Sequence, residues 1–315
     1  MSFIINTNNI SGGKLSYNVK NIISQNSSLT NSLSVQYVVV AGGGSSVNNV
    51  NANGQGGAGA GGALTGTVLL TTNTAYTITV GAGGALSTNG NNSIFYNLTA
   101  LGGGYSGQPS ILAGNGGCGG GAGRAGIANQ AGGTGSQGGN GGATASVTSF
   151  GGSGGGGGAG GNGVTGIAPD NAYYYITPYP SSGGIGIVNP ILYSTAGQLV
   201  GNKYYLAGGG GGAYFVKVQP PGGLGGGGVG SGNNGDAAYP PGNGAPNTGG
   251  GAGGPLRNSA PFTTGGSGVI ALQIPLNRTA TFSSGVTYVI DYVTSQYIIY
   301  KITATSTTSE TVTFT

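Results

Sequence analysis

The sequence predicts an all-β fold built around a bundle of polyglycine II helices, with short β-strands on either side of the glycine-rich part and an antiparallel β segment after it. Three observations lead to this prediction. The chain has 76 glycines among 315 residues but only 4% charged residues, whereas disordered segments combine low hydrophobicity with high charge or polarity. Hydrophobic residues make up 37% of the chain and fall into alternating blocks, between which glycine recurs every third residue. A folded object is therefore expected; a loose tether, the usual form of a glycine-rich chain, is the alternative.

Composition divides the chain into three parts. Residues 1–34 are polar and rich in Asn and Ser, and we interpret them as an N-terminal attachment segment, with irregular β structure as the alternative. Residues 35–275 form the expected glycine-rich polyglycine-helix domain. Residues 276–315 form a C-terminal β segment, for which we expect three or four antiparallel strands with a turn at 283–285. This last segment either completes the fold or docks onto another protein.

Alternating or β-branched blocks predict the strands next to the glycine tracts. The block "VQYVVVAGGG" runs straight into glycine, and "TAYTITVGAGG" alternates apolar residues with threonine. In the C-terminal segment we expect one strand face to carry Val286, Tyr288, Ile290 and Tyr292. The four predicted strand blocks are 35–44, 74–84, 92–104 and 265–275.

Glycine follows a strict three-residue register in two tracts. An extended left-handed helix with three residues per turn brings every third residue to the same edge. Collagen shares this geometry but needs abundant proline, and this chain has only 13 prolines. We therefore expect polyglycine helices that lie side by side and hydrogen-bond through their backbones. The register positions are 114, 117, 120, 123, 126, 132, 135, 138 and 141, broken at Asn129, and then 151, 154, 157, 160, 163 and 166.

A single polyglycine helix is expected to melt. Fixing one residue's backbone costs about 1–2 kcal/mol, whereas one hydrogen bond returns a net of about 0.5–1.5 kcal/mol. In a close-packed array each residue both donates and accepts, and Cα–H···O contacts add about 0.5–1 kcal/mol each. The bundle can therefore form only cooperatively, with apolar side chains sealing it. The candidates for this role are Ile111, Leu112, Ile127, Val147, Phe150, Val164 and Ile167.

The residue inventory argues against catalysis. The chain has no histidine, which removes the usual general base, the commonest metal ligand and any Ser-His-Asp triad. Matches to G-x-S-x-G at 151–155 and G-x-G-x-x-G at 121–126 arise by chance in a chain so rich in glycine. We expect no enzyme activity, no cofactor and no metal site. The four acids are too widely separated for a carboxylate pair or a calcium loop: Asp170, Asp236, Asp291 and Glu310.

Charge and termini limit the partners. The eight basic residues are scattered, so the net charge of +4 reflects few acids and not a basic patch; no nucleic-acid partner is expected. Cys118 is the only cysteine, and we interpret it as a buried thiol. The N-terminus lacks a secretory pattern, and no stretch approaches the ~18 apolar residues of a membrane span. We expect synthesis and retention in the cytosol and no membrane contact.

Tyrosines cluster between the later glycine tracts. The segment "PDNAYYYITPYP" (169–180) contains four of them. Tyrosine offers a rigid amphipathic surface at little entropic cost, as in binding loops, so glycine runs that return to one end would present these segments together. The alternative is that the rings cover exposed edges of the bundle or bury an oligomer interface. The receptor-contact candidates are Tyr173, Tyr174, Tyr175, Tyr179, Tyr193, Tyr204, Tyr205, Tyr214 and Tyr239.

The order of these pieces resembles the glycine-rich domain of phage tail-fibre and other viral surface proteins. The similar features are "YVVVAGGG", "YTITVGAGG", "NGNNSIFYNLTALGGG", the long GG-x tracts and the closing "GGSGVIALQIP". The stacked polyglycine helices also look like those of receptor-binding adhesins at the tips of phage long tail fibres. The resemblance implies a virion structural protein, made in the host cytosol and exposed on the particle surface, that acts as an adhesin or fibre-tip component for host attachment.

The resemblance also implies partners. These are other virion proteins of a fibre or capsid, a host surface receptor or glycan, and further copies of the chain in a homo-oligomer, as in trimeric viral fibres. The β segment 276–315 departs from the tip adhesins, so both a fibre tip and a capsid location stay open. Two alternative functions remain: a purely architectural capsid or appendage component without receptor binding, and an ice-binding polyglycine protein whose flat faces order water.

Overall fold

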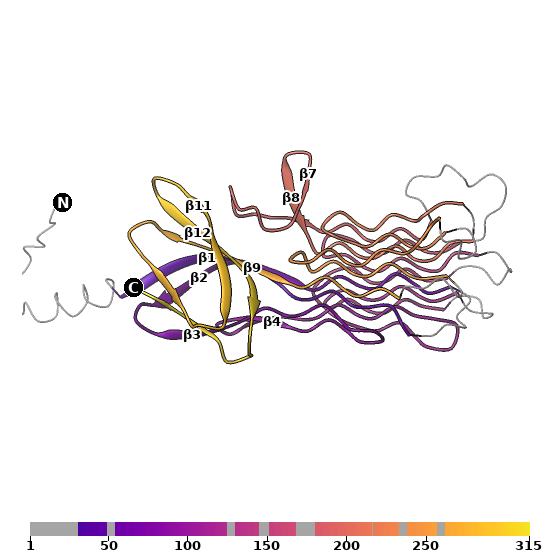
Figure 1. The fold of residues 1–315 in the computed structure, drawn as a ribbon, viewed down its shortest axis with the longest axis horizontal. Helices are drawn as coiled ribbons and strands as arrows, with labels where there is room; N and C mark the ends of the chain where they lie inside the picture. Colours follow the sequence, from indigo (N-terminus) through magenta and orange to yellow (C-terminus); the bar gives the residue numbers. More distant parts are fainter. Residues whose placement is uncertain are drawn as a thin grey trace, which may run out of the picture.

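The protein consists of a β-sandwich and an elongated bundle of glycine-rich runs that extends from it (Figure 1). The computed structural model describes residues 31–48, 54–124, 130–144, 151–167, 180–215, 217–232, 238–256 and 262–315. These residues form β-strands and no α-helix, and accordingly none of them belongs to a helix that is long and apolar enough to span a bilayer. Most of the predicted attachment segment, residues 1–30, lies outside the described residues.

The strands form three antiparallel sheets. Two sheets have five strands, in the orders β11-β12-β9-β1-β2 and β10-β13-β3-β4-β5, and a smaller one has the order β6-β8-β7. The strands are β1 (Ser32–Val40), β2 (Ala63–Thr71), β3 (Ala75–Thr79), β4 (Ser93–Phe95), β5 (Leu98–Ala100), β6 (Ile187–Val188), β7 (Gln198–Val200), β8 (Lys203–Leu206), β9 (Val269–Pro275), β10 (Ala280–Phe282), β11 (Val286–Val293), β12 (Tyr297–Thr305) and β13 (Thr311–Phe314).

The central strand β1 is apolar on both faces because it separates two hydrophobic cores. Val35 and Val39 lie in the core between the two five-stranded sheets. Val38 and Val40 lie in a second core on the other side, where Leu206 of β8 packs. A strand buried on both faces needs a continuous apolar run and not an alternating one, which explains the "VVV" of this segment.

Three predicted strand blocks are confirmed as β1, β3 and β9. The block 92–104 is not one strand, because β4 and β5 form a hairpin whose turn places Tyr96 at φ 58°. Three further strands in the segment 187–206, and β2, were not expected from the sequence.

The C-terminal segment completes both large sheets. It forms four strands, as expected, with a turn at 284–285; β11 and β12 extend the sheet of β9, while β10 and β13 extend the sheet of β3. The predicted common face of Val286, Tyr288, Ile290 and Tyr292 is wrong, since Tyr288 packs on Phe282 while Tyr292 stacks on Tyr193. Register shifts between Thr287 and Tyr288 and between Ile290 and Tyr292 interrupt the alternation, because a bulge changes which side of the sheet the following residues face.

In the bundle, neighbouring N–H groups of one run donate to different runs. Gly42, Gly43 and Gly44 donate to three separate runs, and Ser45 and Ser46 return to the first two of them. The direction of donation therefore turns about the run with a period of three residues. The acceptors, in order, are the carbonyl oxygens of Asn91, Gly266, Gly59, Thr88 and Thr263, at 2.9 to 3.2 Å.

The runs approach one another as closely as a bare backbone allows. A Cβ added at Gly157 would lie 2.1 Å from the Gly139 oxygen. Glycines outside the predicted register are enclosed as tightly, since a Cβ at Gly155 or Gly156 would lie 1.9 Å from a carbonyl oxygen. A run surrounded on all sides needs glycine at nearly every position, so the three-residue register alone does not identify the enclosed sites.

Candidate functional site

Connections between the runs lie at both ends of the bundle. Next to the sandwich two of them are the short turns 158–161 and 246–249, whereas a third connection, 187–206, carries β6, β7 and β8. The first donates the Ala159 N–H to Ala207 beside β8, and the second donates the Asn247 N–H to the Ser267 hydroxyl beside β9. The internal segments outside the described residues are 49–53, 125–129, 145–150, 168–179, 216, 233–237 and 257–261.

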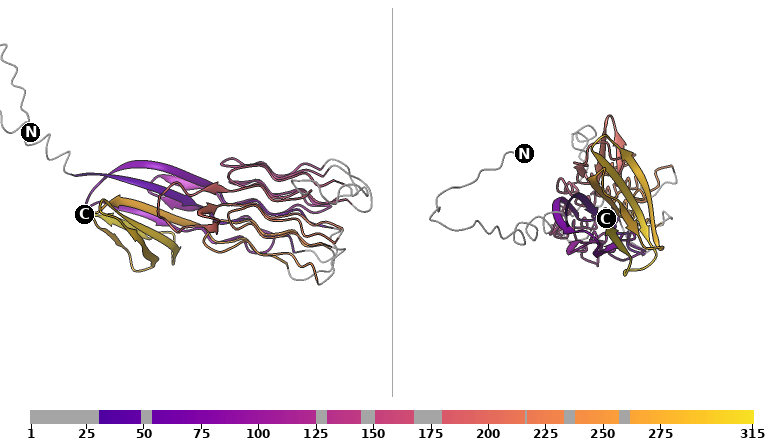
Figure 2. Two further views of the ribbon diagram at one scale, coloured as in Figure 1. Left: turned by 90° about the horizontal axis from the view of Figure 1, so that it is seen from above. Right: turned by 90° about the vertical axis from the view of Figure 1, so that its left-hand side faces the viewer.

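The residues that flank these segments form one hydrogen-bonded layer, which we call the far face. It lies at the end of the bundle opposite the sandwich (Figure 1), and Figure 2 shows the same arrangement from above. The described residues on either side of all seven internal segments lie at this end. Its N–H donors and C=O acceptors, at 2.9 to 3.0 Å, include the pairs Arg124 to Gly54, Thr144 to Gln130, Gly152 to Ile167, Ser231 to Gly254 and Ser46 to Thr263.

Polar and aromatic groups gather behind the far face. The Arg124 guanidinium lies 4.1 Å from the Phe215 ring centroid, in cation–π contact. Buried Gln55 accepts the Val47 N–H and the Ser106 hydroxyl. Among the described residues, five buried side-chain oxygens lack a hydrogen-bond partner, those of Gln108, Gln130, Thr144, Ser153 and Ser181. Each belongs to this end of the bundle, and each such group costs about 1–3 kcal/mol, a cost that functional surfaces often retain.

Some of the predicted receptor-contact tyrosines belong to the far-face end of the bundle. Tyr173, Tyr174, Tyr175 and Tyr179 lie outside the described residues, but residues 167 and 180, which flank their segment, belong to the far-face end. Two further candidates lie at this end. Tyr214 is only 5% exposed and packs against Gly152, so its ring offers no surface to a receptor. Tyr239 is partly exposed, and its carbonyl accepts the Gly232 N–H and the Ser231 hydroxyl.

The other candidate tyrosines lie at the sandwich end, so the structure does not bring the tyrosine segments together. Tyr204 and Tyr205 are half-buried in β8. Tyr193 is 56% exposed and stacks on Tyr292 of β11, with ring centroids 5.0 Å apart and an interplanar angle of 14°. The chain returns to the sandwich at 187–206 between visits to the far face, and nothing in the local sequence marks that return.

A carboxylate fixes the loop of Tyr193 to β11. Asp291 accepts the Ser194 hydroxyl at 2.9 Å and both the N–H, at 2.6 Å, and the hydroxyl of Thr195. Lys301 of β12 lies 3.4 Å from the same carboxylate and donates to Thr195. Burial raises the pKa of Asp291, but these hydrogen bonds and the lysine outweigh it and hold the pKa below its usual value.

A second carboxylate closes the turn of the C-terminal segment. Glu310 is 8% exposed and accepts the hydroxyls of Ser283, Ser306 and Thr307. These hydrogen bonds, that of Ser283 above all, hold the pKa of Glu310 below its usual value. Both carboxylates are therefore committed to structure. No group of three or more metal-ligating side chains occurs in the described part of the chain.

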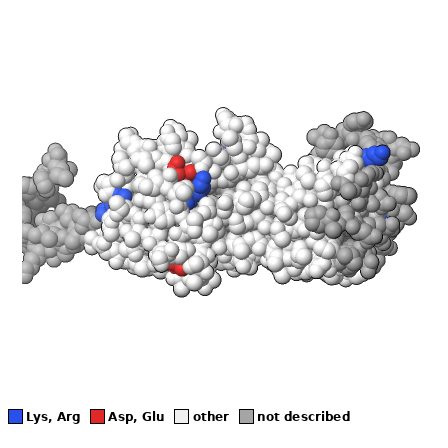
Figure 3. Space-filling view, viewed as in Figure 1, with Lys and Arg blue, Asp and Glu red and all other residues white. Residues whose placement is uncertain are grey.

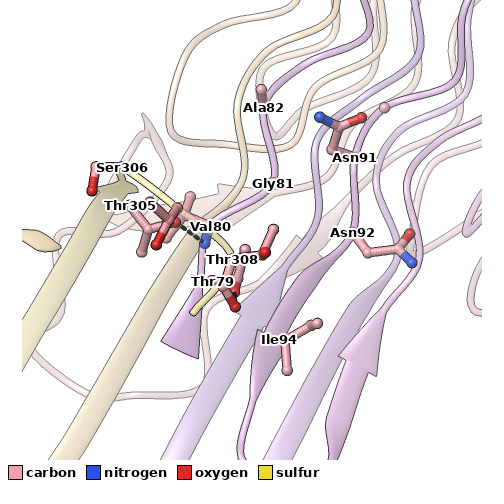
Figure 4. A pocket seen from close by; sticks show the side chains of 12 residues that line it. Thr79, Val80, Gly81, Ala82, Asn91, Asn92, Ile94, Thr305, Ser306 and Thr308 are labelled. Carbon is pink, nitrogen blue, oxygen red and sulfur yellow. Dashed lines mark hydrogen bonds between the residues drawn. The ribbon is translucent and has the colours of Figure 1, made fainter. Parts of the chain in front are cut away.

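A hollow of about 580 Å³ lies where the sandwich meets the bundle (Figure 4). Its lining includes Asn91, Asn92 and the hydroxyl-rich segment 305–308. A neighbouring hollow of about 490 Å³ shares Gly90 and Asn92 with it. Neither is lined by a charged residue, so they offer neutral hydrogen-bonding groups beside apolar side chains such as Ile94 and Leu101. Part of this lining serves the fold, since the Asn92 oxygen accepts the Gly102 N–H and the Thr305 hydroxyl accepts the Val80 N–H.

The exposed surface is almost uncharged. Figure 3 shows Lys, Arg, Asp and Glu in only a few spots of the visible face. The sequence model of the glycine-rich domain family matches residues 24–275. The chain belongs to this family. No curated protein and no solved structure was found to match it. The matched glycine-rich domain ends at the last residue of β9, so β10 to β13 are an addition that its sheets incorporate.

Proposed function

We propose that this glycine-rich protein is a virion structural protein, exposed on the particle surface, that presents the far face for host attachment. The observation that supports this most is the number of connections that gather at the far face. Seven connections, among them 168–179 with its four tyrosines, start and finish at the far face, beside the described tight turns 85–88 and 108–111. Fewer connections lie at the sandwich end, where 187–206 forms the small sheet of β6, β7 and β8. Binding residues concentrate on loops positioned by a rigid scaffold.

The scaffold itself is proposed to consist of polyglycine II helices. The three-residue rotation of the hydrogen-bond donors in 42–46 supports this assignment, because a helix with three residues per turn points successive groups in three directions. At a rise of about 3.1 Å per residue, an eight-residue run such as 41–48 spans about 25 Å. The far face is thereby held at a fixed distance from the sandwich.

The sandwich end is the proposed attachment to other virion proteins. Strand β1 begins there, and the C-terminus lies there as well (Figure 1). A protein anchored through this end leaves its far face free. A host receptor or glycan is the proposed ligand of that face.

Replacing residues 168–179 by a Gly-Ser segment of equal length tests the attachment function. We expect purified protein to lose binding to host cells while its thermal unfolding is unchanged. The matched control is Asn202→Ser in the turn between β7 and β8 beside the sandwich, with Gly201 kept because its φ of +62° suits glycine. Unchanged binding in both variants, with intact particles, would favour the architectural alternative; thermal hysteresis in dilute solution would favour ice binding.

A further inference from the structure

Strand β11 is an edge strand with an unusually apolar surface. Among the described residues it pairs with β12 alone, which leaves its other backbone edge free. Its five large exposed side chains are Tyr288, Val289, Ile290, Tyr292 and Val293, each 42 to 55% exposed. Leu192 and Tyr193, at 70% and 56% exposed, extend this surface. We call these seven residues the edge patch.

Because of the bulges in β11, side chains of the edge patch lie on both sides of the sheet, next to the free backbone edge. Tyr288 packs on Phe282 at the rim of the sandwich core, with ring centroids 4.2 Å apart. Tyr292 instead stacks on Tyr193, on the opposite side of the sheet. Apolar groups therefore flank the unpaired backbone on both sides. Proteins usually protect such an edge with lysine, proline or a covering element.

The edge patch carries no uncompensated charge. Its strand contains one ionised group, Asp291, whose side chain is 3% exposed and lies beside Lys301. A partner that covers this surface therefore meets no isolated charge, and a neutral apolar partner fits it. The patch itself is such a partner, so two copies are complementary to each other.

The size of the edge patch suits a contact between two copies. Applying the exposed fractions to about 200 Å² for a tyrosine and ~100 Å² for an aliphatic side chain gives about 500 Å² of apolar surface per copy. Two copies then bury ~1,000 Å², the lower limit for a specific interface. Interfaces of this size are at the low end of the range, where weak and transient contacts are found.

We propose that the edge patch is covered by the edge patch of a second copy, with the two β11 strands antiparallel across a two-fold axis. Antiparallel pairing of identical strands is two-fold symmetric, and the same surface then serves both copies. This inference concerns the sandwich end and does not depend on what the far face binds. It departs from the trimer that the resemblance implies.

Sedimentation analysis of the full chain from about 1 to 100 µM tests the proposal. We expect a reversible monomer–dimer equilibrium, and hydrogen exchange in β11 that slows as the concentration rises. Ile290→Lys puts a charge into the apolar patch of each copy, near the middle of β11, so the dissociation constant should rise about a hundredfold or more. Val293→Lys should act in the same way and serves if the first variant unfolds.

Leu69→Lys is the matched control. Leu69 is 70% exposed on β2, the opposite edge strand of the same sheet, so the same charge is added without touching the edge patch. We expect its dimer to be as stable as that of the wild type. A trimer, equal weakening by Ile290→Lys and Leu69→Lys, or a monomer at every concentration would overturn the proposal. A monomer whose β11 amides are protected would place another part of the same chain on this edge.

Discussion

Alanine at Gly157 probes the close packing of the bundle directly. Its Cβ would lie 2.1 Å from the Gly139 oxygen and 2.9 Å from the Asn140 oxygen, whereas carbon–oxygen contacts normally settle near about 3.3–3.6 Å. The neighbouring run must therefore move by about 1 Å. Such overpacking costs about 1–3 kcal/mol, and the shift strains the bonds of Gly139 with Gly119 and Gly158, each worth about 1 kcal/mol. The expected loss is about 3–5 kcal/mol of unfolding free energy.

Gly161→Ala is the same chemical change four residues further along the chain. There the nearest atom to an added Cβ is a methyl carbon of Ile185 at 3.4 Å, an ordinary contact, and the backbone is outside the left-handed region. Alanine at a compatible site restricts the unfolded chain and stabilises by about 0.4–1 kcal/mol. The two variants should therefore change stability in opposite directions.

Urea unfolding followed by far-UV circular dichroism and by tyrosine fluorescence measures both variants. The slope against urea should stay constant, so that the shift in midpoint reports stability. If Gly157→Ala and Gly161→Ala agree within about 0.5 kcal/mol, the usual size of a surface effect, close backbone packing is not what requires glycine at 157. A small loss at 157 accompanied by a changed slope would point instead to an effect on the unfolded state.

Three further outcomes are expected from single residues. Asp291 and Glu310 have lowered pKa values in the folded protein. Their contribution to the free energy of unfolding is therefore present above the unfolded-state pKa and is lost as the pH falls through the lower folded value. Acid titration of the free energy of unfolding should show this loss, and Asp291→Asn should make the loss smaller. Burial raises the pKa of the Cys118 thiol to about 12, so iodoacetamide at pH 8 should modify it in urea but not in the native protein. Ile78→Ala, in the core, should cost about 2–5 kcal/mol, and exposed Leu112→Ala less than ~0.5 kcal/mol in the same unfolding assay.

Local pattern was enough to predict the strands that carry apolar residues in sequence. β1 and β9 stand out because both of their faces are buried, and β3 because it alternates Tyr76 and Ile78 with exposed threonine. β2 escaped detection because Gly66 interrupts its alternation. In the structure the Tyr37 ring of β1 lies opposite Gly66 and fills the space of the missing side chain, a compensation between strands that a single segment cannot reveal.

The hairpin of β4 and β5 was missed for a different reason. Its turn places Tyr96 at φ 58°, where glycine or asparagine is the usual residue. The turn therefore lacks the sequence signal by which hairpins are recognised. Tertiary packing explains the choice of residue, since the Tyr96 ring meets that of Tyr76 edge-on at 5.4 Å.

The neighbours of each glycine run have no local signature at all. The Gly43 N–H donates to Gly266, more than two hundred positions away, and the Gly44 N–H donates to Gly59. All four residues are glycine, so nothing in their identity indicates which run pairs with which. Sequence reasoning could therefore predict that runs pack together but not which ones, nor that 187–206 returns to the sandwich. The distribution of the β11 side chains could not be predicted because strict alternation implies one common face, and the bulges that interrupt it follow from pairing with β12.

The crosswise hydrogen bonds of the bundle also determine how it responds to tension. Because successive N–H groups of 42–46 point sideways to three different neighbours, a pull between the sandwich and the far face stretches the runs lengthwise and shears many of these bonds simultaneously. Peeling one run away would break them in sequence and needs less force. A particle tethered through this protein would thus have a stiff, strong link along the bundle and a weaker one across it.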